Sequence, residues 1–234
     1  MEISVVIPAY NEEERLPKTL ESIIDYFEKL NKTYEIIVVD DGSVDRTVEI
    51  AQKYNPRVRV IQLPKNSGKG AAVKAGIEQS NGDYILFSDA DLSTPIYEFE
   101  KLISRLENSA DIAIGSRAID SSLIKVHQPF YREWMGKTFN KIVQLFVLRG
   151  IKDTQCGFKL FKHSAAKQIF SKAQITGFGF DVEILYLGKK MNYKIVEIPV
   201  EWRNDTKTKI NPIRDSFGML KEILKIRRLH KEIN

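Results

Sequence analysis

The sequence has 234 residues, of which 43% are hydrophobic, so it can bury one full-sized core and lacks the composition of a disordered chain. Its formal net charge of +5 suits an anionic partner such as a nucleotide, a nucleic acid or an acidic membrane surface, and the basic residues are most concentrated between Lys207 and Lys231. Cys156 is the only cysteine, which excludes a disulfide within the chain and predicts a reducing compartment.

Membrane insertion is not expected from this sequence. No apolar run approaches the ~20 residues that a membrane-spanning helix needs. The short apolar run near the N-terminus also lacks the basic start of a signal peptide. We therefore expect a single domain, residues 1–234, that does not cross a membrane.

Strand and helix patterns alternate through the first half of the chain. The predicted elements are, in order, a strand at 3–7, a helix at 13–30, a strand at 35–39, a helix from an N-cap at Asp45 to residue 54, a strand at 58–63, a helix at 68–78, a strand at 84–87, a helix at 96–106 and a strand at 112–114. This alternation predicts an α/β fold with a mostly parallel sheet flanked by helices. Ligands bind beyond the carboxyl ends of such strands. The polar residues expected at that edge are Tyr10, Asp40, Asp41, Asp89 and Asp91.

The second half of the chain is less regular. Its predicted elements are a helix at 131–148, a short strand at 158–161, a helix at 181–190, a strand at 194–200 and a final helix at 213–230.

The sharpest motif is Asp89-Ala-Asp91, two carboxylates separated by one small residue directly after a predicted buried strand. Hard oxygen ligands of this kind suit Mg²⁺ or Mn²⁺ bridging a diphosphate, where the ion acts as a Lewis acid for the leaving nucleoside diphosphate. Asp-x-Asp also arises by chance as a solvated acidic turn. The preceding strand and a second acidic turn nearby favour the metal site.

Two other strand ends carry polar motifs, each with a simpler alternative. In Asp40-Asp-Gly-Ser43, Gly42 permits a tight turn, and an Asp can accept hydrogen bonds from a base or ribose or serve only the turn. In Pro8-Ala-Tyr-Asn-Glu12, Tyr10 can line a base pocket and Glu12 can accept a hydrogen bond. The alternative is that Asn11 or a neighbour caps the next helix.

Two glycine-lysine segments look like phosphate loops but do not match the pattern. In Lys65-Asn-Ser-Gly-Lys-Gly70 the Gly-Lys pair is followed by glycine, where a Walker loop needs Ser or Thr. Gly136-Lys-Thr138 has no glycine at the required upstream position, and no Gly-x-Gly-x-x-Gly follows the first strand. These absences argue against a P-loop NTPase and against a nicotinamide dehydrogenase.

Four motifs in the first half, in this order and spacing, resemble those of family 2 glycosyltransferases of the GT-A fold. They are Ser4-Val-Val-Ile-Pro-Ala-Tyr-Asn-Glu12, Val38-Val-Asp-Asp-Gly-Ser43, Asn66-Ser-Gly-Lys-Gly70 and Asp89-Ala-Asp91. Three further motifs resemble the dolichyl-phosphate β-glucosyltransferases and the related dolichyl-phosphate mannose synthases. They are Gly115-Ser-Arg117, Asp153-Thr-Gln-Cys-Gly-Phe-Lys-Leu-Phe161 and Phe180-Asp-Val-Glu-Ile-Leu-Tyr186. The resemblance covers nearly the whole chain.

This resemblance implies an inverting enzyme that transfers glucose from UDP-glucose to a polyprenyl phosphate on the cytoplasmic face of a membrane. It implies a nucleotide-sugar half at residues 1–117 and an acceptor half at residues 118–234. The implied nucleoside contacts are Pro8, Tyr10, Glu12 and Asp40, and the metal and diphosphate ligands are Asp89 and Asp91, with Asp91 counted as catalytic. Arg117, which is also counted as catalytic, and Arg132 are implied to hold the acceptor phosphate, since the guanidinium fork matches phosphate geometry. Further substrate contacts are expected from Asp41, Lys69, Lys207 and Lys209.

Asp153 is the catalytic base implied by the resemblance, but the chemistry of a phosphate acceptor argues otherwise. An alcohol needs a base because its proton must leave as it attacks. A phosphate monoester has a second pKa near ~6 and is already largely a dianion at neutral pH. Asp153 would then orient Arg117, Arg132 or a lysine, or simply cap the turn before Phe158.

The two long helices predicted in the second half offer a way to reach a lipid. The helix at 131–148 ends in a segment that is apolar nearly all round. The helix at 213–230 combines Ile213, Phe217, Leu220 and Leu224 with Lys221, Lys225 and Arg228. Basic amphipathic helices lie in the membrane interface and favour anionic lipid. The alternative is that both helices pack on the core or on a partner chain.

Other functions remain open at this stage. Within the same fold, the chain can be a GDP-mannose-dependent polyprenyl-phosphate mannosyltransferase or a soluble transferase for a cell-surface polysaccharide. A non-catalytic nucleotide-sensing module is disfavoured by the intact Asp89 and Asp91 pair and by Arg117. Nucleic-acid binding is disfavoured because the basic residues cluster on one apolar helix without an aromatic platform. The oligomeric state is not determined by the sequence.

Overall fold

The computed structural model describes residues 2–205 and 212–232, apart from the side chains of residues 212–217. The strands are β1 (Ile3–Ala9), β2 (Tyr34–Asp40), β3 (Val58–Gln62), β4 (Tyr84–Ser88), β5 (Ile112–Ser116), β6 (Ile124–Val126), β7 (Phe158–Lys162), β8 (Ile195–Pro199) and β9 (Trp202–Arg203). The helices are α1 (Leu16–Lys29), α2 (Thr47–Gln52), α3 (Lys69–Gln79), α4 (Phe99–Glu107), α5 (Phe130–Phe146), α6 (His163–Lys172), α7 (Phe180–Lys190) and α8 (Pro212–Leu229). Two short 3₁₀ helices are η1 (Ile96–Glu98) and η2 (Ser121–Leu123).

The main sheet has seven strands in the order β3-β2-β1-β4-β7-β5-β8. Four of its strand pairs are parallel, and only β7 runs antiparallel to its two neighbours. The predicted α/β fold with a mostly parallel sheet is therefore confirmed. Strands β6 and β9 form a separate two-stranded sheet that was not predicted.

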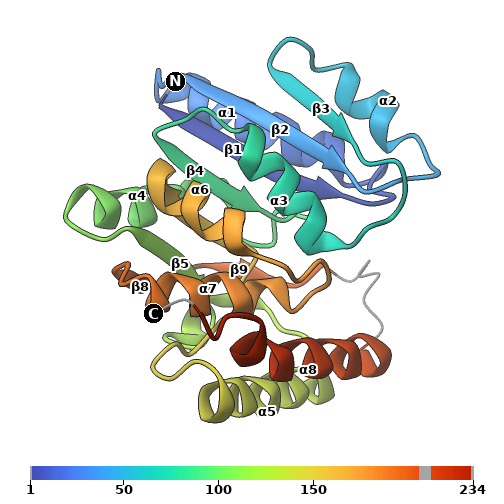
Figure 1. Cartoon of the computed structure of the whole chain (residues 1–234). Helices are drawn as coiled ribbons and strands as arrows, with labels where there is room; N and C mark the ends of the chain where they lie inside the picture. The colour runs from blue at the N-terminus through green and yellow to red at the C-terminus, as the bar shows by residue number, and fades with distance from the viewer. Residues whose placement is uncertain (1, 206–211, 233–234) are drawn as a thin grey trace.

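Helices cover both faces of the sheet (Figure 1). Alternate residues of a strand point to opposite faces, so Val5 packs in the cluster with α1, α2 and α4 while Val6 packs in the cluster with α3, α6 and α7. Both faces are buried, which explains why the central strands are apolar at nearly every position. The carboxyl ends of the parallel strands β1, β2 and β4 lie together at one edge of the sheet.

The antiparallel strand β7 determines what reaches this edge. Because β7 runs against β4, the amino end of β7 lies beside the carboxyl end of β4, and Phe158 pairs with Ser88. Residues 153–157, which lead into β7, therefore enter the same edge as Asp89 and Asp91. The short strand was predicted, but its direction was not.

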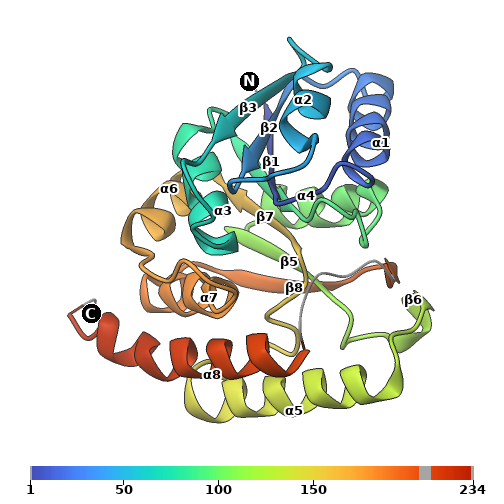
Figure 2. The same ribbon diagram turned by 90° about the vertical axis from the view of Figure 1, so that its right-hand side faces the viewer.

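Helices α5 and α8 lie side by side at one end of the molecule, beyond α7 (Figure 2). Phe139 and Val143 of α5 and Ile223 and Ile226 of α8 are buried, so both helices pack on the core through one face. None of the helices within the described residues combines the length and the apolar character needed to span a bilayer.

The buried face of α8 differs from the apolar stripe predicted for it. Leu224 is 59% exposed, and the core contacts come from Ile223 and Ile226. The helix therefore has two apolar faces, and the predicted stripe followed the outer one. The side chains of Ile213 and Phe217, which belong to the predicted stripe, lie outside the described residues.

Three local predictions were wrong or displaced. Helix α6 was missed because it follows β7 without an intervening Gly, Pro or other turn signal, although Ala165, Ala166, Ile169 and Phe170 have helical spacing and are buried. The predicted helix at 96–106 is split into η1 and α4. Helix α2 begins two residues after Asp45, whose Oδ1 accepts the Thr47 N–H at 3.0 Å, and ends at Gln52.

Candidate functional site

Two cavities meet at the edge where β1, β2 and β4 end. The motif cavity, of about 360 Å³, is lined by residues of the predicted motifs, including Pro8, Tyr10, Glu12, Asp41 and Asn66. The arginine cavity, of about 260 Å³, is lined by residues that include Arg117, Arg132, Gln155, Asp181 and Trp202. Both cavities share Lys69, Asp89, Asp91 and Phe178. The two spaces are therefore joined at the Asp-x-Asp motif.

Asp89 and Asp91 form the common floor of the two cavities, and a lysine stands against them. The Lys69 Nζ lies 2.6 Å from Asp89 Oδ1, and Asp91 Oδ1 accepts the Ser93 N–H at 2.9 Å. Burial, and then the neighbouring charge of Asp89, raise the pKa of Asp91. Burial opposes the charge on Lys69, yet Asp89 and Asp181 outweigh it and raise the lysine pKa. The acidic floor is thus favourable for a cation.

The donor set at this floor is small. Among the described residues, no group of three or more His, Cys, Asp or Glu side chains gathers as a metal cage. Asp89 and Asp91 alone would leave most positions around a cation to phosphate oxygens and water, which is how Mg²⁺ is bound in many nucleotide sites. The residues therefore fit a Mg²⁺ or Mn²⁺ ion that is bound together with a diphosphate.

Gly157 allows Asp89 to occupy its position. The Asp89 N–H donates to the Gly157 carbonyl at 3.0 Å, and a Cβ on Gly157 would lie 1.9 Å from Asp89 Oδ2. Any side chain at this position would displace the carboxylate. The glycine of the 153–161 motif was quoted in the sequence, but its role needed the antiparallel placement of β7.

The two aspartates after β2 have different surroundings. Both carboxylate oxygens of Asp40 lie within 3.3 Å of the Ser43 backbone nitrogen and can accept its N–H. Asp40 therefore serves the turn, as the simpler alternative for this motif predicted. Asp41 lines the motif cavity, and its carboxylate accepts the N–H groups of Ser67 and Gly68 at 2.6 and 2.9 Å. Burial raises the pKa of Asp41 against these hydrogen bonds. Asp41 thus fixes the loop that carries Lys69.

The loop after β1 brings Tyr10 and Glu12 to the motif cavity. Tyr10 is 40% exposed, while Glu12 is nearly buried and accepts two hydrogen bonds from Arg15 at 2.5 and 2.6 Å. The alternative that Asn11 or a neighbour caps the next helix is wrong, because no side chain that the structure describes caps the start of α1. Asn11 Oδ1 instead accepts the Val44 N–H at 2.8 Å and so joins two loops.

Arg15 was missed by the sequence reasoning. Its Nη1 lies 3.9 Å from Asp91 Oδ2 and 3.4 Å from Asp205 Oδ2, so one guanidinium links the loop after β1 to the Asp-x-Asp motif. The residue directly precedes α1 and was read as part of that helix. The only signal in the sequence was its spacing of three residues from Glu12.

Arg117 and Asp153 form a two-pronged ion pair. Arg117 Nε and Nη2 donate to the Asp153 carboxylate at 2.7 and 2.9 Å, and the Arg117 backbone N–H donates at 2.9 Å. Burial alone would raise the pKa of Asp153, but Arg117 holds it below its usual range. Asp153 Oδ1 also accepts the Gln155 N–H at 3.2 Å. Of the partners considered for Asp153, which were Arg117, Arg132, a lysine and its own turn, the carboxylate bonds to Arg117 and to the turn.

The rest of the arginine cavity comes from distant parts of the chain. The Arg117 guanidinium lies 5.3 Å from the centre of the Trp202 ring. Arg132, in the first turn of α5, lines the cavity, and its Nε is buried without a hydrogen-bond partner among the described residues. Lys207 and Lys209, predicted as further substrate contacts, lie outside the described residues.

A buried ion pair beneath the cavities was also missed. Lys159 of β7 is fully buried, pairs with Asp181 and donates to the Cys156 carbonyl at 2.7 Å. Asp181 lies in the first turn of α7 and lines the arginine cavity. The available signal was a lysine flanked by apolar residues inside a predicted strand, since a lysine there is almost never fully buried unless it is paired.

Comparisons with known proteins show which sequence family the chain resembles. The family model for glycosyl transferase family 2 matches residues 4–170. Dolichyl-phosphate beta-glucosyltransferase from Dictyostelium discoideum is 40% identical over 241 residues, covering 96% of this chain and 73% of the relative. The human protein of that name is 40% identical over 242 residues, covering 97% and 75%, and the Saccharomyces cerevisiae protein is 37% identical over 247 residues, covering 96% and 74%.

Solved structures show the same fold at low identity. Mannosyl-3-phosphoglycerate synthase from Rubrobacter xylanophilus has a TM-score of 0.73 at 19% identity, covering 99% of this chain and 75% of that one. Glucosyl-3-phosphoglycerate synthase from Mycobacterium tuberculosis, in complex with Mn²⁺, UDP and glucosyl-3-phosphoglycerate, has a TM-score of 0.69 at 20% identity, covering 96% and 78%. The fold is thus the GT-A fold. The chain is a glycosyltransferase that belongs to family 2 and, within it, to the dolichyl-phosphate beta-glucosyltransferases.

Proposed function

We propose that the chain transfers glucose from UDP-glucose to a polyprenyl phosphate, such as dolichyl phosphate, at the cytoplasmic face of a membrane. The relatives' names support the sugar and the acceptor. The observation that carries the proposal is the junction of two cavities of different composition, one lined by the nucleotide-sugar motifs and one whose lining includes two arginines. A single free cysteine, buried at residue 156, is in keeping with a reducing compartment.

The motif cavity is proposed as the donor site. Pro8, Tyr10 and Asp41 line the space for the nucleoside, and Asp40 supports it through the turn below. Lys69 pairs with Asp89 at the place proposed for the diphosphate, so its ammonium group can offset the negative charge of the diphosphate. Asp89 and Asp91 would hold Mg²⁺ or Mn²⁺, which supplies Lewis-acid stabilisation of the leaving diphosphate.

The arginine cavity is proposed as the acceptor site. Arg117 and Arg132 would hold the phosphate of the lipid beside the shared floor, so that one of its oxygens faces the anomeric carbon. That oxygen forms the new bond to C1 while the C1–O bond to UDP breaks on the opposite side, which inverts the configuration. The acceptor enters as a dianion and has no proton to lose. No base is then required, and Asp153, ionised against Arg117, serves to hold the arginine.

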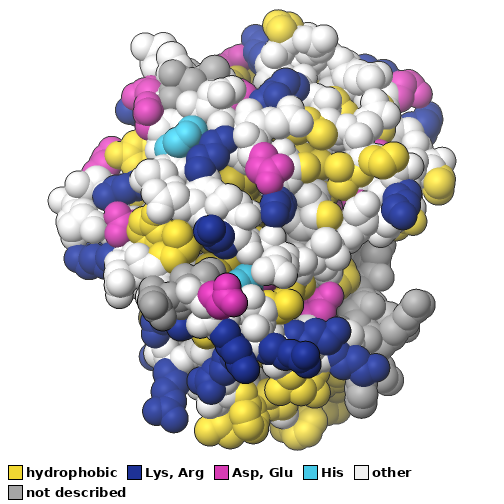
Figure 3. Space-filling view, in the orientation of Figure 1, with side chains coloured by type: hydrophobic (Ala, Val, Ile, Leu, Met, Phe, Trp, Pro, Cys, Tyr) yellow, Lys and Arg dark blue, Asp and Glu magenta, His cyan; other side chains and the backbone are white. Residues whose placement is uncertain are grey.

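The lipid is proposed to arrive from the α5 and α8 side. Figure 3 shows hydrophobic side chains at the lower end of the molecule beside a row of Lys and Arg side chains. The exposed apolar residues are Phe130, Tyr131, Trp134, Leu145 and Phe146 of α5 with Leu224 and Leu229 of α8. The exposed basic residues of α8 include Lys221, Lys225 and Arg228. Aromatic rings and cations of this kind favour the headgroup region of a bilayer.

One experiment tests the donor and acceptor together. Purified protein is incubated with radiolabelled UDP-glucose or GDP-mannose, each with a polyprenyl phosphate in anionic vesicles and with Mg²⁺ or Mn²⁺. The expected result is labelled lipid from UDP-glucose, with β configuration at the sugar and at least about tenfold less label from GDP-mannose. Faster labelling from GDP-mannose would identify a mannosyltransferase. Donor consumption without labelled lipid would refute the acceptor.

A further inference from the structure

The loop at residues 177–179 forms the boundary between the two cavities. Phe178 lines both the motif cavity and the arginine cavity, next to the shared Lys69, Asp89 and Asp91. Glycines stand on either side of it, at 177 and 179. Glycine leaves the backbone many accessible conformations, so the loop needs external contacts to keep the ring in one place.

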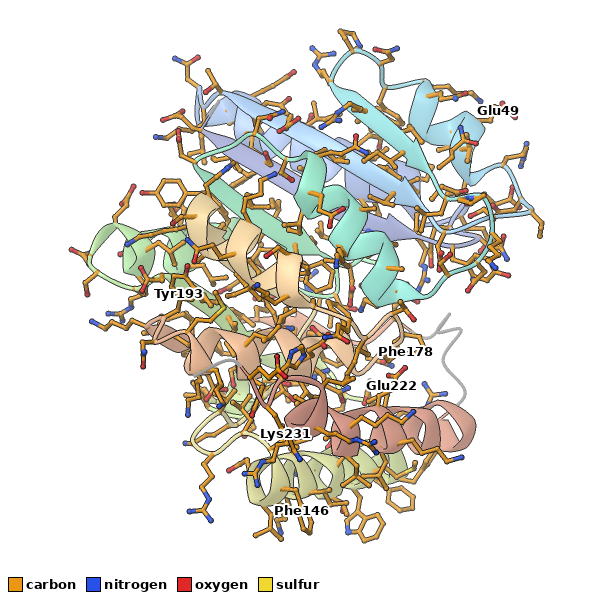
Figure 4. The ribbon with its side chains drawn as sticks, viewed as in Figure 1. Glu49, Phe146, Phe178, Tyr193, Glu222 and Lys231 are labelled. Carbon is orange, nitrogen blue, oxygen red and sulfur yellow. The ribbon has the colours of Figure 1, made fainter. Side chains whose placement is uncertain are left out.

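Glu222 of α8 supplies one such contact. Its Oε2 accepts the Gly179 N–H at 2.8 Å, immediately before the first turn of α7. A Cβ on Gly177 would lie 2.3 Å from Glu222 Oε1, and one on Gly179 would lie 2.7 Å from Oε2. The two glycines therefore make room for the carboxylate. Figure 4 shows Phe178 and Glu222 near each other at the junction of the loop and α8.

A second carboxylate holds the preceding part of the same loop. Glu183 is fully buried and accepts the N–H groups of Gln174 and Ile175 at 3.0 and 2.9 Å. It also contacts His230 Nε2 at 2.7 Å, just beyond the last turn of α8. Since Glu183 fixes residues 174 and 175, Glu222 is left to fix the end of the loop that carries Phe178.

The other side of the loop rests on the helix that carries Lys69. The Ala71 N–H donates to the Thr176 carbonyl at 3.2 Å, and a Cβ on Gly68 would lie 2.4 Å from the same oxygen. The loop, Lys69 and the Asp89 floor are therefore packed as one unit. A change in the loop would alter the space directly above the shared carboxylates.

We propose that Glu222 is a positioning residue of the transfer reaction: through Gly179 it holds Phe178 at the boundary of the two cavities, where the ring keeps water from the anomeric carbon of the bound donor. This inference rests on the proposed function. Without the hydrogen bond from Gly179 to Glu222, the loop relaxes and the arginine cavity opens to solvent. As a result, water competes with the acceptor phosphate. Water then forms the bond to C1, the C1–O bond to UDP breaks, and glucose, UDP and a proton are released.

The test compares transfer with donor hydrolysis in Glu222→Ala and Glu222→Gln. Labelled UDP-glucose is supplied with and without polyprenyl phosphate in vesicles, and lipid-linked glucose and free glucose are both counted. Glu222→Ala is expected to lower the ratio of transfer to hydrolysis by about tenfold, with a higher KM for the acceptor. Glu222→Gln keeps an oxygen that can accept the Gly179 N–H, so its ratio should lie nearer that of the parent. Glu232→Gln, the same change at an exposed position beyond α8, is the matched control.

A second variant displaces the carboxylate and keeps its charge. Gly177→Ala should push Glu222 away from Gly179 and lower the same ratio in the parent protein. In the Glu222→Ala background it should have almost no further effect, because the contact is already lost. A parental ratio in Glu222→Ala, with normal transfer, would overturn the inference and leave the proposed function standing. Absence of transfer in the parent protein would instead refute the proposed function.

Discussion

The motif cavity and the arginine cavity are built in different ways. The walls of the motif cavity come almost entirely from four short segments within the first 91 residues, three of which directly follow strands of one parallel sheet. Besides the end of β4 and the residues after it, the arginine cavity takes residues from the end of β5, α5, the segment before β7, the start of α7, β9 and α8. One cavity is therefore assembled by local sequence and the other by topology. The walls of the motif cavity are therefore encoded mainly by motifs that stand next to strands in the sequence, whereas the walls of the arginine cavity depend on how the second half of this chain folds.

The charges of the two cavities differ in the same way. The motif cavity has Glu12, Asp41 and the shared Asp89 and Asp91, and its basic groups are already paired with these carboxylates. The arginine cavity adds two arginines, Arg117 and Arg132, and two further carboxylates, Asp181 and Asp205. Its guanidinium groups suit the anionic acceptor proposed for it, and the carboxylates of the motif cavity suit the metal-bound diphosphate proposed there. Variants that touch one cavity, both, or the surface beyond them can therefore separate their roles.

The largest effect is expected where the cavities overlap. Asp89→Asn and Asp91→Asn remove charge from the common floor without changing core volume, so transfer should fall by at least about a hundredfold while the fold is kept. Initial rates of lipid labelling measure transfer, and circular dichroism shows whether the fold is kept. Asp25→Asn, the same change at an exposed position of α1, should have no effect. Near-normal turnover of both variants in EDTA would show that no metal is used.

Local sequence was sufficient for most of the first half of the fold. Three of the four motifs directly followed a strand whose apolar residues were recognisable, so Tyr10, Asp41 and Asp89 could be placed at one edge from the βα alternation alone. Helix ends were less well predicted. The start of α2 moved by two residues because Asp45 accepts the Thr47 N–H from outside the helix.

Contacts between distant segments could not be read from the sequence. The closeness of Gly157 to Asp89 depends on β7 running antiparallel, and a five-residue strand carries no signal for its direction. The pairs Arg117–Asp153 and Lys159–Asp181 join residues more than 20 positions apart. Arg15 was assigned to the predicted helix at 13–30, although it directly precedes α1. The sequence therefore placed motif residues at the edge of the sheet more successfully than it identified the residues that contact them.

The next effect concerns the surface beyond the arginine cavity. Lys221, Lys225 and Arg228 changed together to Glu should reduce binding to anionic vesicles by about a hundredfold, since each basic residue contributes roughly 1 kcal/mol near such a surface. Vesicle sedimentation at two salt concentrations measures this, and added salt should weaken binding of the parent protein.

A matched triple variant controls for net charge. Lys18, Lys29 and Arg105, which are exposed on α1 and α4, changed to Glu give the same charge change away from α8. This variant should sediment almost like the parent. Equal loss of binding in both variants would mean that overall charge, and not the face of α8, attracts the protein to lipid.

A smaller loss is expected for one arginine. Arg117→Ala should lower transfer by about tenfold to a hundredfold, because a charge-assisted contact to the acceptor phosphate contributes roughly 1.5–3 kcal/mol. UDP affinity should be nearly unchanged, since Arg117 lines only the arginine cavity. Isothermal titration calorimetry with UDP and Mn²⁺ measures the UDP affinity, and the acceptor KM reports the loss of the phosphate contact. Weakened UDP binding would contradict the proposal that the motif cavity binds the donor and the arginine cavity binds the acceptor.

The smallest effect is expected for Asp153→Asn, which distinguishes a positioning role from base catalysis. The variant keeps the size of the side chain but loses its charge, so it should hold Arg117 less firmly and lower transfer less than Arg117→Ala does. The pKa of Asp153 is held below its usual range by Arg117, so the carboxylate is ionised both folded and unfolded at neutral pH and any stability it contributes is lost only as the pH falls through that low pKa. The acid limb of the pH–rate profile should therefore follow the second ionisation of the acceptor phosphate, near ~6, in the parent protein and in the variant alike. Rates between pH 5 and pH 8 with saturating donor measure this. A greater loss than in Arg117→Ala, with unchanged binding of both substrates and a vanished acid limb, would make Asp153 the base.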